Sequence, residues 1–224
     1  MCGRYTIALN PAEYQLEFGF EDFPADFSQR YNVAPTQPVA VVTDATARKV
    51  EWMRWGLIPA WAKDPSIGAR MINARSETLG EKPSFKVALQ KKRCLLLADG
   101  FYEWQKRPGK LTSIPHYFTL ADHKPFVFAG LWEQWTSPEG QGIRSCTIIT
   151  CGPNELVAPI HDRMPVILDA VTAWSWLNAE SAAQAQTLLV PYPAEKMQVV
   201  EVSSRVNSPA IDSPTLIEPE RKLI

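Results

Sequence analysis

The chain has 224 residues, long enough for one sizeable hydrophobic core, and it contains no Gly/Ser tract, charge block or internal repeat at which it would divide, so we expect a single domain over residues 1–224. Apolar residues make up 46% of the sequence, but the longest apolar runs, such as residues 94–98, are too short to cross a bilayer, and we expect no membrane partner. The net charge of −1 neither supports nor excludes nucleic-acid binding, which would need a local cluster of cations.

The first predicted element is a short amphipathic helix that begins at Pro11. Asn10 is a favourable N-cap, and proline suits the first helical position because its missing N–H would have no partner there. Glu13, Leu16 and Phe18 continue the helical pattern.

Strands dominate the rest of the chain. Two more helical stretches are predicted, at residues 83–91 and 169–177, and the second continues to residue 189 after a break near Asn178. The strand-like segments are residues 39–43, 49–55, 93–98, 117–120, 126–131, 145–150, 166–168 and 197–202. This count favours a β-rich α+β domain. Nineteen prolines favour irregular connections that can line a groove, and the clearest of these is the long loop from 58 to 75.

Cys2 is the most informative single residue. The sequence opens Met-Cys-Gly-Arg, and a small second residue lets the initiator methionine be removed, so we expect the mature chain to begin with Cys2. An N-terminal cysteine carries its thiol and its α-amine on adjacent carbons, and the pair can close a thiazolidine ring on an aldehyde. Their ordinary pKa values of about 8.5 and about 7.7–8.0 leave part of each group deprotonated near neutral pH. Taken alone, this cysteine is more readily explained by chance than by function.

Three short segments repeat one pattern. In each, a reactive or hydrogen-bonding residue is followed two positions later by an arginine: Cys2 and Arg4, Asn73 and Arg75, and His161 and Arg163. In an extended chain such a pair projects to one face. The planar fork of arginine suits phosphate oxygens, so the three pairs indicate a phosphate-bearing substrate. For a single pair, an ordinary surface ion pair is the better explanation, but the repetition weakens it.

Glu103 and His161 are candidate acid–base groups. Glu103 follows an apolar strand and an Asp-Gly turn, and its neighbours Tyr102 and Trp104 are expected to exclude water and raise the pKa of its carboxyl group. The alternative is a strand glutamate that faces water. His161 begins a predicted strand, where a functional imidazole and a structural one are both open.

The remaining histidines and cysteines have no predicted role in chemistry. His116 and His123 occupy ordinary loop positions, and no Cys or His pair has the spacing of metal ligands, so we expect neither a metal nor another cofactor. Cys94, Cys146 and Cys151 are predicted to be buried apolar residues. The lack of a signal peptide and of a disulfide framework favours a reducing cytosol.

An aromatic-rich segment, residues 52–61, could offer faces on which nucleobases stack. Most of its tryptophans are predicted to lie in the core, and Trp61, in the loop after Pro59, is the best candidate for exposure. The residues after Trp61 are Ala-Lys-Asp, so base stacking has no second aromatic there.

Several motifs together resemble the SRAP family, which is named for SOS-response-associated peptidases. They are Cys2-Gly-Arg-Tyr, Arg30-Tyr-Asn-Val-Ala-Pro35-Thr, Trp55-Gly-Leu-Ile-Pro, Asn73-Ala-Arg75-Ser-Glu77-Thr, Asp99-Gly-Phe-Tyr-Glu103-Trp104 and His161-Asp-Arg163-Met-Pro165. The match runs from Cys2 to about Leu168. The resemblance implies a single-domain sensor of abasic sites that crosslinks covalently to single-stranded DNA. It also implies a mixed fold with a few peripheral helices, whose branched, barrel-like β-sheet surrounds a DNA-binding groove.

The resemblance also implies roles for individual residues. Cys2 would be the crosslinking residue, and Asn73, Glu103 and His161 would complete the active site. Arg75 and Arg163, together with Arg4, would hold DNA phosphates. Pro35 and Trp61 match positions near the DNA path, and Thr150 matches a position near the site.

Three functional hypotheses follow. In the first, the α-amine and thiol of Cys2 form a thiazolidine with the open aldehyde of an abasic site, while Glu103 and His161 assist ring opening of the sugar. In the second, the chain is a thiol peptidase or amidohydrolase with Cys2 as N-terminal nucleophile, and removal of Met1 is its minimal reaction. In the third, it is a noncovalent single-strand binding module. We expect a cytoplasmic monomer that associates with the nucleoid through DNA.

Overall fold

Two long strands form the frame of the molecule in the computed structural model, which describes residues 2–109 and 111–220. They are β9 (Phe126–Thr136) and β10 (Gly142–Cys151), and they pair antiparallel from Gly142 opposite Thr136 to Ile148 opposite Gly130. Both are rich in β-branched and aromatic residues, which pack well on a pleated sheet. Gly140, with φ of 86°, supplies a backbone conformation that the connecting turn requires.

This pair and three further strands close into a five-stranded barrel. The others are β3 (Pro38–Val42), β4 (Glu51–Trp55) and β6 (Arg93–Ala98), and the order β10-β4-β3-β6-β9 returns to β10. The β4–β10 pair is parallel and the other four are antiparallel, so the sheet is mixed. Closure leaves no unpaired edge around the ring.

Three short strands branch from the barrel, and five other strands form a second sheet. β5 (Asn73–Arg75) and β11 (Met164–Pro165) pair with the last residues of β10, and β12 (Ile167–Leu168) pairs with β9. The second sheet has the order β13-β8-β7-β1-β2. Its strands are β1 (Tyr5–Ile7), β2 (Arg30–Val33), β7 (Gly100–Gln105), β8 (Ile114–Leu120) and β13 (Met197–Glu201). The predicted β-rich, branched and barrel-like mixed sheet is confirmed.

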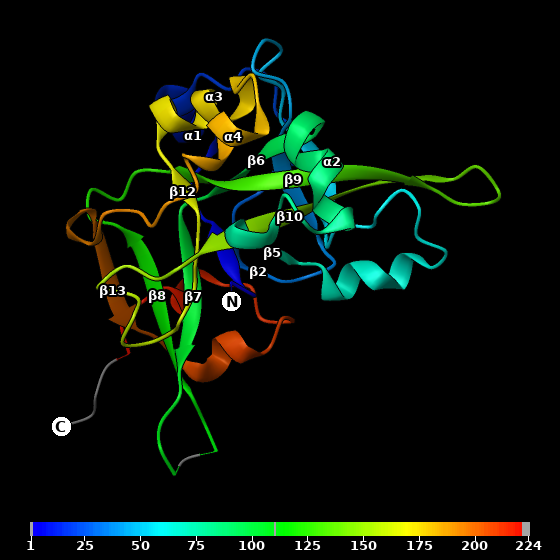
Figure 1. Cartoon of the computed structure of the whole chain (residues 1–224). Helices are drawn as coiled ribbons and strands as arrows, with labels where there is room; N and C mark the ends of the chain where they lie inside the picture. The colour runs from blue at the N-terminus through cyan, green and yellow to red at the C-terminus, as the bar shows by residue number, and fades with distance from the viewer. Residues whose placement is uncertain (1, 110, 221–224) are drawn as a thin grey trace.

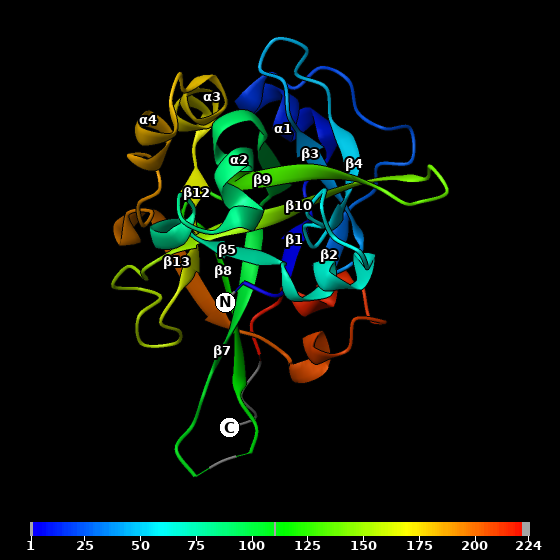
Figure 2. The same ribbon diagram turned by 45° about the vertical axis from the view of Figure 1, so that its right-hand side comes forward.

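The helices lie on the outside of the barrel (Figures 1 and 2). They are α1 (Pro11–Phe18), α2 (Pro83–Lys91), α3 (Ala170–Asn178) and α4 (Ala182–Gln186). Short 3-10 turns are η1 (Pro65–Arg70), η2 (Ser76–Thr78), η3 (Ala194–Lys196), η4 (Ser204–Asn207) and η5 (Pro214–Leu216). The predicted helix starts and the break after residue 178 are confirmed. Asn10 caps α1 in a capping box with Glu13, and Asp169 caps α3.

Three local predictions were wrong. The region from 58 to 75 is not one loop, because it contains η1 and β5. His116 lies on β8 rather than in a loop, since that strand begins three residues before the predicted start. Leu16 is 89% exposed, so α1 is less amphipathic than its pattern predicts.

The core spans both sheets, and Tyr5 of β1 joins them. Its ring packs edge-on against Trp55 of β4 and Phe128 of β9, with centroids 5.2 and 5.5 Å away. The cysteines at 94, 146 and 151 are buried as predicted, and burial raises the pKa of Cys151 to about 12. Within the described part of the chain, no helix is long and apolar enough to cross a membrane.

Candidate functional site

Cys2 lies three residues before the start of β1 and is fully buried. β1 is held on both sides, because Tyr5 pairs with Val33 of β2 and with Phe101 of β7. The side-chain amide of Asn73 donates a hydrogen bond of 2.8 Å to the Cys2 carbonyl oxygen. Burial raises the pKa of the Cys2 thiol far above its usual value, and the nearby Glu103 carboxylate raises it further. The backbone of residue 2 is thus held in a defined position.

Asn73 reaches Cys2 because of how β5 joins the barrel. β5 runs parallel to β10, with Asn73 opposite Ile148 and Arg75 opposite Thr150. The polar strand is short, and its position depends on the longer and more apolar β10. The position of the Cys2 carbonyl is therefore coupled to the closed barrel.

Glu103 is a buried carboxyl group in the middle of β7. It pairs with His116 of β8, and only 2% of its surface is exposed. Burial raises its pKa from 4.5 to about 7. A group with this pKa can both donate and accept a proton near neutral pH, as the sequence analysis predicted; the alternative of a water-facing glutamate is wrong.

His161 lies beside Glu103, in the segment that follows β10. Its Nε2 is 3.8 Å from a Glu103 carboxylate oxygen. The backbone amide of Arg163 and a carboxylate oxygen of Asp162 both lie 3.0 Å from Nδ1, and the neutral ring can accept from the first or donate to the second. Burial lowers the pKa of His161, which favours this neutral form. The structure therefore brings the two predicted acid–base residues, Glu103 and His161, together, with Glu103 close enough to Cys2 to raise the pKa of its thiol.

The three predicted arginines have different surroundings. Arg4 is half-buried, and its Nη1 donates to Asn32 Oδ1 and to the Val206 carbonyl, both at 2.8 Å. Arg163 makes a two-bond ion pair with Glu77, with Nη1–Oε1 at 2.6 Å and Nη2–Oε2 at 2.9 Å. Arg75 is exposed, and its side chain has no hydrogen bond or ion pair within residues 2–109 and 111–220. Their phosphate contacts stay predictions, and Arg75 is the arginine most open to a ligand.

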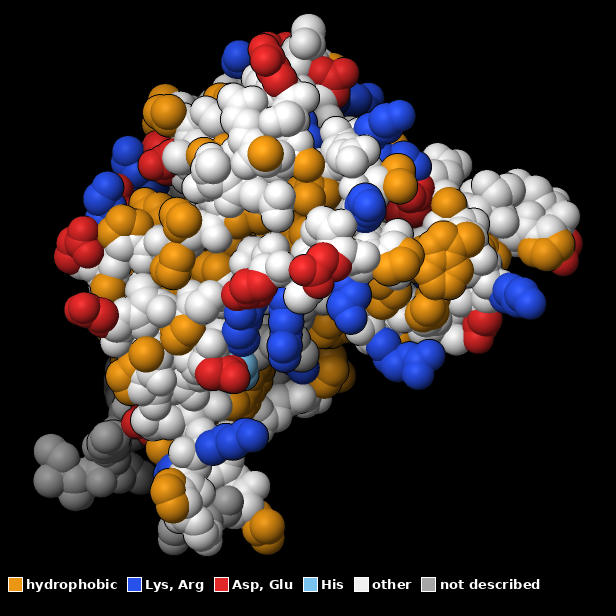
Figure 3. Space-filling model, in the orientation of Figure 1, with side chains coloured by type: hydrophobic (Ala, Val, Ile, Leu, Met, Phe, Trp, Pro, Cys, Tyr) orange, Lys and Arg blue, Asp and Glu red, His pale blue; other side chains and the backbone are white. Residues whose placement is uncertain are grey.

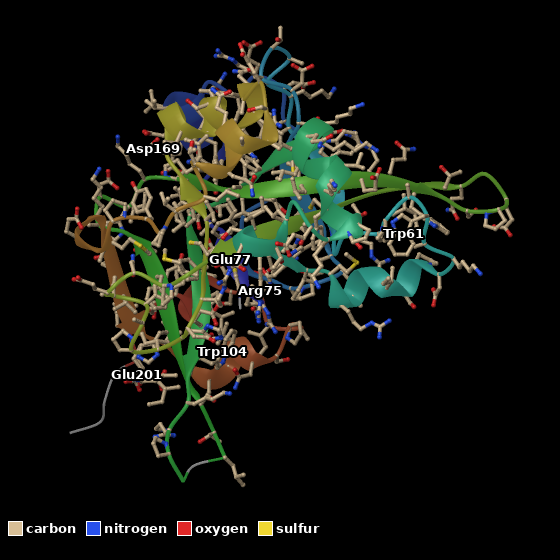
Figure 4. The ribbon with its side chains drawn as sticks, in the orientation of Figure 1. Trp61, Arg75, Glu77, Trp104, Asp169 and Glu201 are labelled. Carbon is tan, nitrogen blue, oxygen red and sulfur yellow. The ribbon has the colours of Figure 1, made fainter. Side chains whose placement is uncertain are left out.

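The other predicted contact residues are spread more widely. Thr150 is buried at the end of β10, and its carbonyl accepts a 2.7 Å bond from Arg163. Pro35 is half-buried after β2, and Trp61 is 61% exposed as predicted. Figure 4 shows Trp61 beside the β9–β10 hairpin, well to one side of Arg75 and Glu77. Thr150 thus belongs to the immediate surroundings of the arginines, while Trp61 lies at a distance.

Two residues near the site were not singled out as functional by sequence reasoning. Glu77 accepts hydrogen bonds from Arg163. The sequence carried a signal for it, because Glu77 follows Arg75 by two positions in the motif Asn73-Ala-Arg75-Ser-Glu77-Thr. The charge of Lys106 contributes to the low pKa of His161 from the end of β7, three residues after Glu103. Figure 3 shows cationic side chains gathered in the middle of this face with acidic side chains directly beside them. Among the described residues, no group of three His, Cys, Asp or Glu side chains could hold a metal ion.

Comparisons with known proteins agree with this architecture. Residues 1–209 match the family model described as SOS response associated peptidase (SRAP). The abasic site processing protein YoqW of Bacillus subtilis is 47% identical, over 97% of this chain and 99% of that protein. The mouse abasic site processing protein HMCES is 32% identical, over 100% of this chain and 77% of that protein.

A solved structure shares the fold over nearly the whole length. The crystal structure of a protein from Bacteroides thetaiotaomicron superposes with a TM-score of 0.87 at 27% identity, covering 98% of this chain and 100% of that one. With a family match over most of its length, this chain belongs to the SOS response associated peptidase (SRAP) family.

Proposed function

We propose that this chain captures abasic sites in single-stranded DNA by a covalent thiazolidine bond to Cys2 and so shields the lesion from strand cleavage. The observation that carries the proposal is the hydrogen bond from Asn73 to the Cys2 carbonyl, which fixes residue 2 beside the buried Glu103. The names of the relatives YoqW and HMCES, both abasic site processing proteins, support it. The proposal requires removal of Met1, which lies outside the described residues.

The chemistry needs proton transfers that Glu103 and His161 are suited to make. An abasic sugar must open from its hemiacetal to an aldehyde, and Glu103, with a pKa near 7, can supply and remove the protons of that step. The α-amine adds to the aldehyde carbon, and water leaves to give an imine. The thiol then adds across the C=N bond: sulfur bonds to carbon and its proton passes to nitrogen. Ring closure consumes the imine, which would otherwise promote β-elimination and strand breakage.

Arg75 provides the first contact with the DNA backbone in this proposal. It is exposed and lies opposite Thr150 on β10, close to the site. Phosphate contacts hold a strand in register without reading its sequence, so we expect little dependence on base identity. Discrimination against intact DNA then depends on the aldehyde. The protein would act as a single-domain monomer in the cytoplasm, at the nucleoid.

A thiol peptidase or amidohydrolase remains the second candidate. The same groups support it, because the His161 imidazole and the Glu103 carboxyl group could assist an acyl transfer at Cys2. Its minimal reaction is removal of Met1 from the chain itself.

Intact mass of the purified protein, before and after incubation with an abasic single-stranded oligonucleotide, tests the first proposal. We expect loss of Met1 and a covalent adduct that survives denaturant. Cys2→Ala, or one extra residue ahead of Cys2, should abolish the adduct, and persistent crosslinking by either would sink the proposal. Cys2→Ser separates the two candidates. A hydroxyl can still act as an acyl nucleophile, whereas it gives a far less durable ring with an aldehyde.

A further inference from the structure

The guanidinium group of Arg163 is already occupied by the protein itself. Its two terminal nitrogens, Nη1 and Nη2, each donate one hydrogen bond to the Glu77 carboxylate. The second proton of Nη2 is directed to the Thr150 carbonyl at 2.7 Å. Nε is buried and has no hydrogen-bond partner among the described residues, so it is not open to a ligand. The second N–H of Nη1 is then a single donor, which cannot by itself hold a phosphate through two parallel bonds.

A phosphate and Glu77 would need the same edge of Arg163. Arginine binds phosphate and carboxylate alike through two parallel N–H donors. The Arg163 side chain is only 13% exposed, whereas Glu77 is 54% exposed and is the partner that faces solvent. Glu77 can therefore move out into water, while Arg163 stays held from behind by Thr150.

The position of Glu77 makes this competition relevant to a bound strand. It lies in η2, two residues after the exposed Arg75 that ends β5. Arg75 lies opposite Thr150 in the β5–β10 pairing, and Thr150 also accepts from Arg163. A DNA backbone that meets Arg75 thus arrives next to the Arg163–Glu77 pair. Figure 4 labels Arg75 and Glu77, which lie near one another in this view.

We propose that Glu77 is a built-in competitor of phosphate at Arg163, which keeps the affinity for undamaged single strands low. This inference rests on the proposed function, because it assumes that a single strand crosses Arg75 and Arg163. With the cation at Arg163 neutralised, an intact strand gains little from that position and leaves readily. A strand with an abasic site is retained by its covalent bond, so selectivity does not depend on tight noncovalent binding.

The test is noncovalent binding of an oligothymidylate without abasic sites, which cannot crosslink. Glu77→Gln keeps the side-chain shape and removes the charge, and we expect about a threefold to fivefold gain in affinity, the range that a partly exposed ion pair allows. The log–log dependence on salt should steepen by about 0.7, since one more cation becomes available to a phosphate. Glu81→Gln is the matched control. It removes an exposed carboxylate on the same segment that has no arginine partner among the described residues, and it should leave both quantities unchanged.

An Arg163→Ala background identifies the mechanism. The gain from Glu77→Gln should vanish there, and a gain that persists would overturn the inference, as would weaker binding by Glu77→Gln or equal effects of Glu77→Gln and Glu81→Gln. Thermal unfolding checks that each variant is folded. Should Glu77→Gln fail to fold, Glu77→Asp, whose carboxylate is one methylene shorter, should still give a smaller gain. Loss of crosslinking by the unsubstituted protein would contradict the proposed function alone, because this assay involves no covalent step.

Discussion

At the scale of single residues, the site depends on one hydrogen bond to the backbone of Cys2. Asn73→Ala removes the donor to the Cys2 carbonyl. We expect the crosslinking rate to fall by about 10-fold to 100-fold, because a small misplacement of a reacting group has effects of this size. Single-turnover assays on denaturing gels measure it. Asn73→Asp, which has nearly the same shape but cannot donate, should be as slow as Asn73→Ala, and a wild-type rate in both would show that the hydrogen bond has no role.

Glu103 should make the stability of the protein depend on pH. Its pKa is about 7 in the folded chain and about 4.3 when unfolded. Between these values only the folded state binds the proton, so the free energy of unfolding falls as pH rises and the loss is complete above about pH 7. Glu103→Gln lacks this loss. The variant should match the wild type near pH 4 and exceed it by up to about 3 kcal/mol near pH 8.

Urea unfolding at several pH values checks this prediction. The exposed Glu81→Gln serves as the control, and its difference from the wild type should stay small throughout. A constant difference between Glu103→Gln and the wild type from pH 4 to 8 would contradict the raised pKa.

At the scale of elements, Asp99 links the connection between β6 and β7 to β1 and α1. It lies between β6 and β7 and is 6% exposed. Its carboxylate accepts hydrogen bonds from the Thr6 hydroxyl, the Tyr14 hydroxyl and the backbone amides of Ala8 and Leu9. Because β1 begins three residues after Cys2, this cluster anchors the strand that leads away from the site.

Asp99→Asn should therefore destabilise the fold. An asparagine offers one acceptor oxygen, and its NH₂ group faces donors that have lost their acceptor. We expect a loss of about 2–4 kcal/mol in the free energy of unfolding, measured in urea. Tyr14→Phe removes a single donor and should cost about 1 kcal/mol. Wild-type stability of Asp99→Asn would mean that the cluster does not hold β1.

Elements with local signals were predictable from the sequence, and elements without them were not. Asn10-Pro11 and Asp169 determine the starts of α1 and α3 within one turn of chain. β1 and β5 have three residues each, and they exist because distant strands pair with them, as β10 does with Asn73. Neither period nor propensity carries that information.

For the candidate site, too, the sequence predicted some features and not others. The residue types at positions 2, 73, 103 and 161 were identified from their motifs. The sequence did not show that two of the arginines are already bound within the protein. Arg4 donates to Val206, which is 202 positions away, and Arg163 donates to Glu77, which is 86 positions away.

At the scale of the whole molecule, two of the three arginines predicted to hold DNA phosphates are already bound within the protein. The net charge is −1, Arg4 is bound within the protein, and Arg163 is paired with Glu77. The sequence pattern of three arginines predicts a log–log salt slope near −2 for single strands, and the structure predicts one between about −0.7 and −1.4. Titration of an intact oligothymidylate at several salt concentrations measures the slope. A value at or beyond about −2 would mean that all three arginines contact phosphates.

The complete burial of Cys2 bears on how long the protein stays competent. Under the proposed function Cys2 reacts only once, and the cell contains many oxidants that could consume its thiol first. A buried thiol with a strongly raised pKa reacts slowly with peroxides, since the thiolate is the form that they oxidise. Under the proposed function, burial of the Cys2 thiol therefore lengthens the time for which the protein stays unreacted, and it lowers the rate of reaction.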